Sequence, residues 1–180
     1  MKNKIILSCL LAVGLSGCTA EFLEITPETS LSSVTFFKTE ADFTQAVNAC
    51  YVPLRTIYND RSYLLAEMHS DNTYYYRNTA FGATEQQEDL ADFSIPVSNN
   101  LTTNTHVLNQ YRQDYLIIAR ANQVLALIDK ADFDATSKAN LKGQAQFMRA
   151  LAYFDIYRYF NKGPLQLTPV ANREQSAAPL

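Results

Sequence analysis

The stretch LKGQAQFMRALAYFDIYRYFNKGP, residues 141–164, has the most regular hydrophobic pattern in the chain. Apolar residues recur in it at spacings of three and four, which is the period of one face of an α-helix. The main stripe consists of Leu141, Ala145, Met148, Ala152, Ile156 and Tyr159. Further apolar side chains lie on other sides: Phe147, Leu151, Tyr153, Phe154, Tyr157 and Phe160. A helix with this pattern needs packing neighbours on several sides.

Residues with known capping preferences mark both ends of this helix. Asp134 or Thr136 is the expected N-cap, because a short side chain with an oxygen accepts hydrogen bonds from the first amides of a helix. Gly163 is expected as the C-cap glycine, and Pro164 cannot continue a helix.

Another helix is expected to begin at Thr39, an N-cap supported by Asp42 three residues later. Its buried stripe consists of Phe43, Ala46, Val47, Cys50, Leu54, Ile57 and Tyr58. Pro53 lies inside this pattern and predicts a kink or break near residues 49–52, because proline lacks the N–H that a helix needs.

A further helix is expected from about residue 105 to residue 130, and residues 131–136 join it to the helix described first. One face carries Leu108, Tyr111, Tyr115, Ile118, Asn122, Leu125 and Ala126, with Ile117, Val124 and Ile128 beside it. Asn122 lies in the middle of that apolar face. We interpret it as a structural side chain that hydrogen-bonds the backbone of a neighbouring loop.

Residues 60–105 show no sustained period, although residues 61–68 fit either a short helix or a short strand. A long loop in a compact helical domain is typically functional or disordered. Tyrosine rings stack on the apolar faces of sugars, while Asp, Asn and Arg hydrogen-bond their hydroxyls. The candidate ligand contacts are Asp71, Asn72, Tyr74, Tyr75, Tyr76, Arg77 and Asn78. Alternatively, these tyrosines simply pack the loop onto the helices.

The N-terminus has the pattern of a targeting signal. Basic residues precede an apolar run at residues 5–15, which is shorter than the about 20 residues that span a bilayer. The sequence LSGC then matches a bacterial lipobox, which predicts that Cys18 is acylated and anchors the protein in a membrane. The alternative is an ordinary cleaved signal with an incidental cysteine.

The expected domain organisation follows from that signal. Residues 1–17 are a lipoprotein signal peptide, residues 18–35 an extended polar tether, and residues 36–180 a helical domain. Cys50 is then the one cysteine left besides Cys18, so no intrachain disulfide is expected. We interpret Cys50 as a small buried hydrophobic residue.

The composition argues against several functions. A net charge of −3 argues against nucleic acid and anionic lipid surfaces as partners. His69 and His106 are isolated from each other, and no HExxH, CxxC or GxSxG motif occurs. Asp89 and Asp92 fit a solvated acidic loop better than a catalytic pair. The sequence thus predicts a protein that is not an enzyme, without catalytic residues, metal site or cofactor.

The run FMRALAYFDIYRYF, followed by a Gly/Pro exit and PLQLTPV, resembles the SusD/RagB family of nutrient-binding outer-membrane lipoproteins of the Bacteroidota. FFKTEADF and YRQDYLIIARANQVLALID agree with it, although Tyr111 stands where the family usually has Trp. The resemblance implies an all-α fold of tetratricopeptide-type helical hairpins with long irregular loops. It covers only the N-terminal part of family members, so the fold is expected to be incomplete at the C-terminus.

The resemblance also implies a function. The protein would capture an oligosaccharide or other nutrient at the cell surface and deliver it to a SusC-like TonB-dependent transporter. It would be held in the outer membrane by its lipid anchor. The alternative is a helical-repeat envelope lipoprotein that acts only as a protein–protein adaptor.

Overall fold

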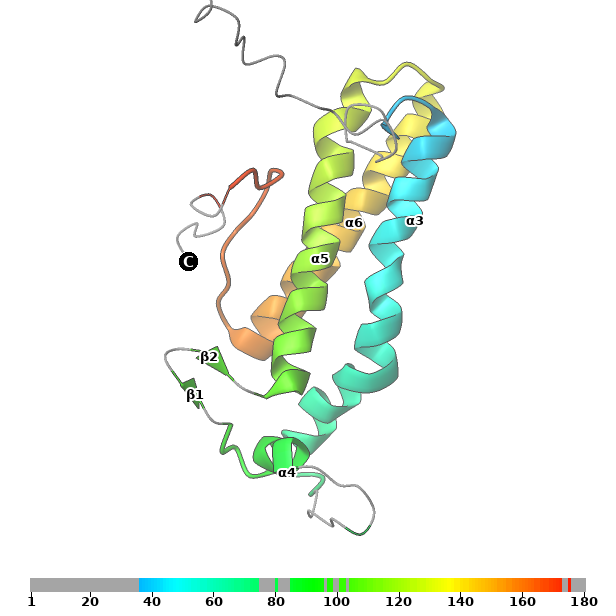
Figure 1. Cartoon of the computed structure of the whole chain (residues 1–180). Helices are drawn as coiled ribbons and strands as arrows, with labels where there is room; N and C mark the ends of the chain where they lie inside the picture. The colour runs from blue at the N-terminus through cyan, green and yellow to red at the C-terminus, as the bar shows by residue number, and fades with distance from the viewer. Residues whose placement is uncertain are drawn as a thin grey trace, which may run out of the picture. The chain divides into compact units, whose positions relative to one another are not determined.

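The computed structural model describes residues 36–74, 80, 85–95, 97–98, 101–102, 104–172 and 175. Three long helices, α3 (Glu40–Thr56), α5 (Thr105–Leu127) and α6 (Ala135–Phe160), each pack against the other two. Helix α5 runs opposite to α3 and α6 (Figure 1). The predicted all-α class is therefore confirmed. The predicted signal peptide and tether lie outside the described residues.

Helix α6 begins as predicted and ends earlier than predicted. The carboxylate of Asp134 accepts a hydrogen bond from the amide of Ser137 at 2.8 Å, so Asp134 is the N-cap. At the other end Asn161, with a φ of 64°, takes the C-cap position, and the prediction of Gly163 was wrong. Asparagine tolerates positive φ better than most residues.

Gly163 is instead required by close approach of the chain to the helices. A Cβ atom at this position would lie 2.6 Å from Cγ2 of Ile156 and 2.8 Å from the hydroxyl of Tyr115. Any larger residue would therefore push the chain away from α5 and α6.

Helix α3 confirms the predicted start at Thr39. The amide of Asp42 donates to Oγ1 of Thr39 at 3.3 Å, and the amide of Thr39 donates to Oδ2 of Asp42 at 2.8 Å. The two bonds form a capping box. The bonds that the Asp42 carboxylate accepts hold its pKa below its usual value, chiefly the bond from the Thr39 amide.

Pro53 does not end helix α3, so of the kink or break predicted near residues 49–52 the break was wrong. Proline lacks an N–H, which leaves the carbonyl of Ala49 without its helical donor. Nη1 of Arg120, on α5, donates to that carbonyl at 2.6 Å. A side chain from a neighbouring helix thus supplies the missing hydrogen bond.

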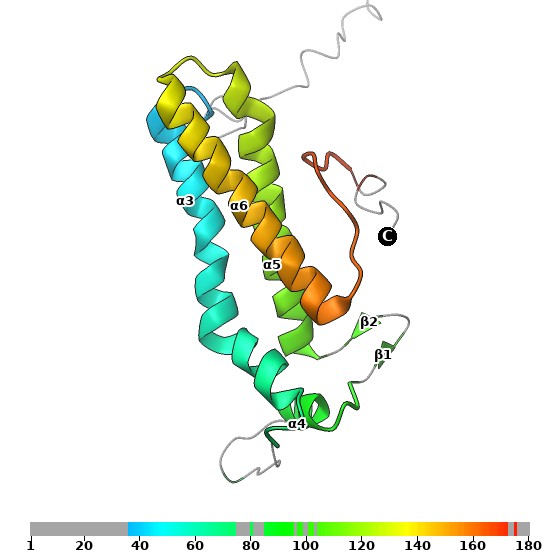
Figure 2. The same cartoon turned by 180° about the vertical axis from the view of Figure 1, so that it is seen from behind.

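Two π-helical turns continue the chain beyond α3. They are η2 (Ile57–Arg61) and η3 (Leu64–Met68), so of the two predictions for residues 61–68 the helix was correct. Helix α4 (Glu85–Ala91) and the antiparallel strands β1 (Val97–Ser98) and β2 (Leu101–Thr102) follow. These short elements were not predicted. They lie near the end of the helices where α5 begins (Figure 2).

The core consists of two clusters along the three helices. One contains Cys50, Ile57, Ile117, Ile118, Ala121, Met148, Ala152 and Ile156. The other contains Phe43, Val47, Val124, Ile128, Leu141 and Ala145. Most of the predicted α6 stripe is therefore buried, as is Cys50, whereas Tyr58 is half-exposed at 50%.

The buried face of α5 is centred differently from the predicted one. Ile117, Val124 and Ile128, expected beside the face, are fully buried, and Ala126 is exposed. Because α5 lies between α3 and α6, it buries a wider face than a helix with one neighbour. Gln110 and Asp114, which are also fully buried, were not predicted to be so.

The chain after α6 turns back along α5 and α6 (Figure 1). Nδ2 of Asn122 donates to the carbonyls of Gln166 at 3.0 Å and Thr168 at 3.2 Å, which confirms its predicted structural role. Nη1 of Arg149 donates to Oδ1 of Asn122 at 2.9 Å, and the hydroxyl of Tyr153 donates to the carbonyl of Gln166 at 2.8 Å. Polar side chains of both helices therefore hold this extended segment.

Candidate functional site

Three of the predicted ligand contacts fall in the part of the chain that the structure describes. Asp71, Asn72 and Tyr74 follow directly after η3, and all three are exposed, Tyr74 to 63%. The other four predicted contacts, Tyr75, Tyr76, Arg77 and Asn78, lie outside the described residues, as does Cys18.

A compact turn positions Asp71 and Asn72. The carbonyl of Glu67 accepts a hydrogen bond from Oγ of Ser70 at 2.7 Å and another from Oγ1 of Thr73. The amide of Asn72 donates to Oγ of Ser70 at 3.3 Å. Short hydroxyl side chains commonly bond nearby backbone in this way, which closes a helix end and forms a turn. The turn leaves the side chains of Asp71 and Asn72 facing solvent.

Two aromatic rings extend this exposed group. The ring of His69 lies 4.0 Å from the ring of Phe93, measured between centroids, and its Nδ1 is 2.8 Å from the carbonyl of Leu90. Leu90 is fully buried and anchors α4, so His69 ties the end of η3 to α4. Phe93 is 62% exposed and has a φ of 56°, which is unfavourable for a bulky residue.

Sequence reasoning missed Phe93, which lies in the region without a sustained hydrophobic period. Two signals from the structure single it out, its exposure and its positive φ. Backbone strain of this kind clusters at ligand-binding positions, and the inference properly runs from the observed residue to the functional hypothesis.

This arrangement is suited to binding. Exposed rings offer flat apolar faces, and the adjacent carboxylate and amide offer hydrogen-bonding groups. Within the described residues, no group of three His, Cys, Asp or Glu side chains could hold a metal ion. Burial raises the pKa of the Cys50 thiol to about 11, so this cysteine is not a nucleophile at neutral pH.

None of the described helices is both long and apolar enough to cross a membrane.

Comparison with known proteins identifies the family. A SusD-like family model, described as "starch-binding associating with outer membrane", matches residues 21–178. The SusD-like protein P38 of Formosa agariphila is 32% identical over 158 residues, which are 87% of this chain and 29% of that protein. The SusD-like protein P2 of the same organism is 26% identical over 166 residues, which are 91% of this chain and 31% of that protein.

The chain thus spans less than a third of the length of these curated relatives. No solved structure is significantly similar to it. Since the family model covers most of the sequence and the relatives match nearly all of it, the chain belongs to the SusD-like family.

Proposed function

We propose that this protein is a cell-surface lipoprotein that captures an oligosaccharide or other nutrient and delivers it to a SusC-like TonB-dependent transporter. The observation that carries the proposal is the exposed group at the end of η3 in a chain of this family. Asp71, Asn72 and Tyr74 are exposed there, and Phe93, whose ring contacts His69 just before them in the chain, is exposed as well.

Capture on this group would need no chemistry. An aromatic ring that stacks on a sugar contributes on the order of 1 kcal/mol, and several weak contacts together give useful affinity. Tyr74 follows η3 and Phe93 follows α4, and these two short elements pack against each other and against α5. A ligand bound by stacking and hydrogen bonds leaves readily, which suits a protein that passes its ligand on.

Anchoring through Cys18 would place this group at the membrane surface. Several acyl chains on one cysteine give stable attachment, and the polar tether of residues 18–35 would let the helical domain approach a transporter.

Titration of an oligosaccharide panel by calorimetry tests the binding proposal. We expect Tyr74→Ala and Phe93→Ala each to weaken binding about fivefold, the equivalent of about 1 kcal/mol. Tyr157→Ala and Phe154→Ala are matched controls, because these rings are also exposed, at 68% and 57%, but lie on α6. Equal affinity in all four variants would show that the ligand binds elsewhere.

An adaptor that binds only protein is the second candidate. Its support is the exposed apolar face of α6, where Phe147 is 61% exposed beside Phe154 and Tyr157. The two candidates predict different results. An adaptor should bind no member of the glycan panel, and substitutions in the α6 face should remove its protein partners. The proposed nutrient-binding protein should bind glycan and co-purify with a TonB-dependent transporter.

A further inference from the structure

A buried carboxyl group lies where α5, α6 and η2 meet. Asp114 on α5 is fully buried, and Asp155 on α6 is 2% exposed. Gln110, one turn before Asp114, is fully buried as well. Three buried polar side chains at one helix junction are costly unless each is well hydrogen-bonded.

The two carboxyl groups differ in their partners. Nη2 of Arg158 donates to Oδ1 of Asp155 at 2.9 Å. Among the described side chains, Asp114 accepts hydrogen bonds from the neutral amide of Gln110, whose Nε2 lies 3.3 Å from Oδ1 and 3.1 Å from Oδ2. Oε1 of Gln110 is itself buried with no donor among the described residues. Asp155 is therefore charge-paired, whereas no described cationic side chain forms an ion pair with Asp114.

A carboxylate buried without a cation takes up a proton instead of remaining charged. Burial is the main cause that raises the pKa of Asp114 to about 7. The hydrogen bond from Gln110 lowers this pKa, the negative charge of Asp155 raises it, and the positive charge of Arg158 lowers it. Tyr58 from η2 and Tyr115 from α5 are the other ionisable side chains that interact electrostatically with Asp114.

The same junction secures the segment that leads to the candidate site. Nη2 of Arg158 also donates to the hydroxyl of Tyr159 at 2.9 Å, and that hydroxyl lies 3.5 Å from Oγ of Ser62, between η2 and η3. If Asp114 loses its proton, its charge competes with Asp155 for Arg158 and draws water into the junction. Both effects weaken the contact of the η2–η3 segment with α5 and α6.

We propose that Asp114 is a proton-controlled latch, which when protonated holds residues 57–68 against α5 and α6 and when ionised loosens them. The proton leaves to solvent as the segment opens. Residues 57–68 lead directly into His69, whose ring contacts Phe93, and into the turn that carries Asp71. The latch therefore couples pH to the mobility of these exposed residues.

Hydrogen–deuterium exchange of the full chain between pH 4.5 and 8.5, corrected for intrinsic exchange rates, tests the latch. In the wild-type protein the opening constant of residues 57–68 should rise up to about tenfold per pH unit below neutrality and level off above about pH 7. In Asp114→Asn, which keeps the shape and removes the charge, this dependence should disappear, and protection at pH 8 should exceed that of the wild type.

Two further variants sharpen the test. Asp155→Asn removes the neighbouring charge and frees Arg158, so the levelling-off should move to lower pH. Asp132→Asn changes an exposed carboxylate between α5 and α6 and should keep the wild-type dependence. Retention of the full dependence in Asp114→Asn would overturn the proposal. Should that variant fail to fold, the carbon-13 signal of the wild-type Asp114 carboxyl decides: titration near neutral pH supports the latch, and ionisation below pH 5 overturns it.

Discussion

Replacing Arg120 by methionine should destabilise the protein only while Pro53 is present. Nη1 of Arg120 donates to the carbonyl of Ala49 at 2.6 Å, in the place of the N–H that Pro53 lacks. Methionine keeps the apolar stem but cannot donate. An unsatisfied carbonyl between packed helices costs about 1–3 kcal/mol. Since Arg120 is half-buried, we expect a loss of about 2 kcal/mol in the free energy of unfolding.

Pro53→Ala changes that expectation. Alanine restores an N–H that can donate to the carbonyl of Ala49, which makes Arg120 dispensable for it. In the Pro53→Ala background, Arg120→Met should therefore cost less than about 1 kcal/mol. The double-mutant cycle should give a coupling free energy of about 1–2 kcal/mol, independent of what Pro53→Ala alone does to packing.

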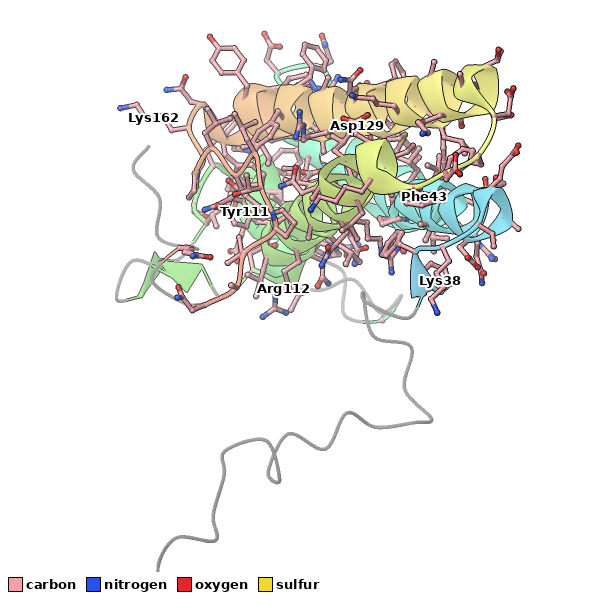
Figure 3. The ribbon with its side chains drawn as sticks, turned by 90° about the horizontal axis from the view of Figure 1, so that it is seen from above. Lys38, Phe43, Tyr111, Arg112, Asp129 and Lys162 are labelled. Carbon is pink, nitrogen blue, oxygen red and sulfur yellow. The ribbon has the colours of Figure 1, made fainter. Side chains whose placement is uncertain are left out.

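Urea unfolding of the four proteins, followed by far-UV circular dichroism, measures this coupling. Arg112→Met is a matched control on the same helix, because Arg112 is exposed and points away from the packed helices (Figure 3). Its replacement should change stability by less than about 0.5 kcal/mol. Equal losses for Arg120→Met in both backgrounds would refute the idea that this arginine replaces the proline's missing donor.

Three further outcomes are expected. Cys18→Ala should release the protein from the membrane fraction of cells, and unchanged membrane association would contradict lipidation at this residue. Asn122→Ala should lower the midpoint of thermal unfolding by removing the bonds to Gln166 and Thr168, a loss of about 2 kcal/mol, and proteolysis should then cut the segment after α6 faster. Wild-type stability should fall by up to roughly 4 kcal/mol between about pH 4 and pH 7, because the folded protein keeps a proton on Asp114 that the unfolded chain releases. A stability that rises between about pH 4 and pH 7 would contradict this prediction.

The parts of the fold that sequence reasoning found are those encoded within a few neighbouring residues. The capping residues Thr39 and Asp134 and the stripe that begins at Leu141 are confirmed, because a cap bond spans three residues and a helix face repeats every three or four. Asn122 was found for a related reason, since an amide in an apolar stripe needs a partner wherever that partner lies.

The parts that were wrong depend on residues far apart in the chain. Pro53 continues its helix because of Arg120, and Arg120 is 71 residues from the carbonyl that it satisfies. Gly163 is needed because Tyr115 approaches it, which no local pattern encodes. Helix α4 and strands β1 and β2 are too short for a periodic pattern to form.

The candidate site also combines residues that the sequence indicated with one that only the packing revealed. The sequence singled out Asp71, Asn72 and Tyr74 as candidate ligand contacts, and all three are exposed in the structure. Whether they contact a ligand stays a prediction. Phe93 was identified only from the structure, through its exposure, its positive φ and its ring contact with His69, a residue 24 positions earlier in the chain.

The burial of Asp114 has a consequence for how such sites should be read from a sequence. In the period of α5, Asp114 sits among Tyr111, Tyr115 and Ile118, where a charged residue is normally taken to mark the solvent side of the helix. That interpretation fails here, because Asp114 is fully buried and Arg158 bonds to Asp155 on α6. Burial raises the pKa of Asp114 to about 7. A carboxyl group inside an apolar stripe of a helix is therefore informative about the packing of that helix. It indicates either a partner on another helix or a proton, and pH separates the two, because a salt bridge gains stability as the carboxyl ionises while a proton-bound carboxyl loses it.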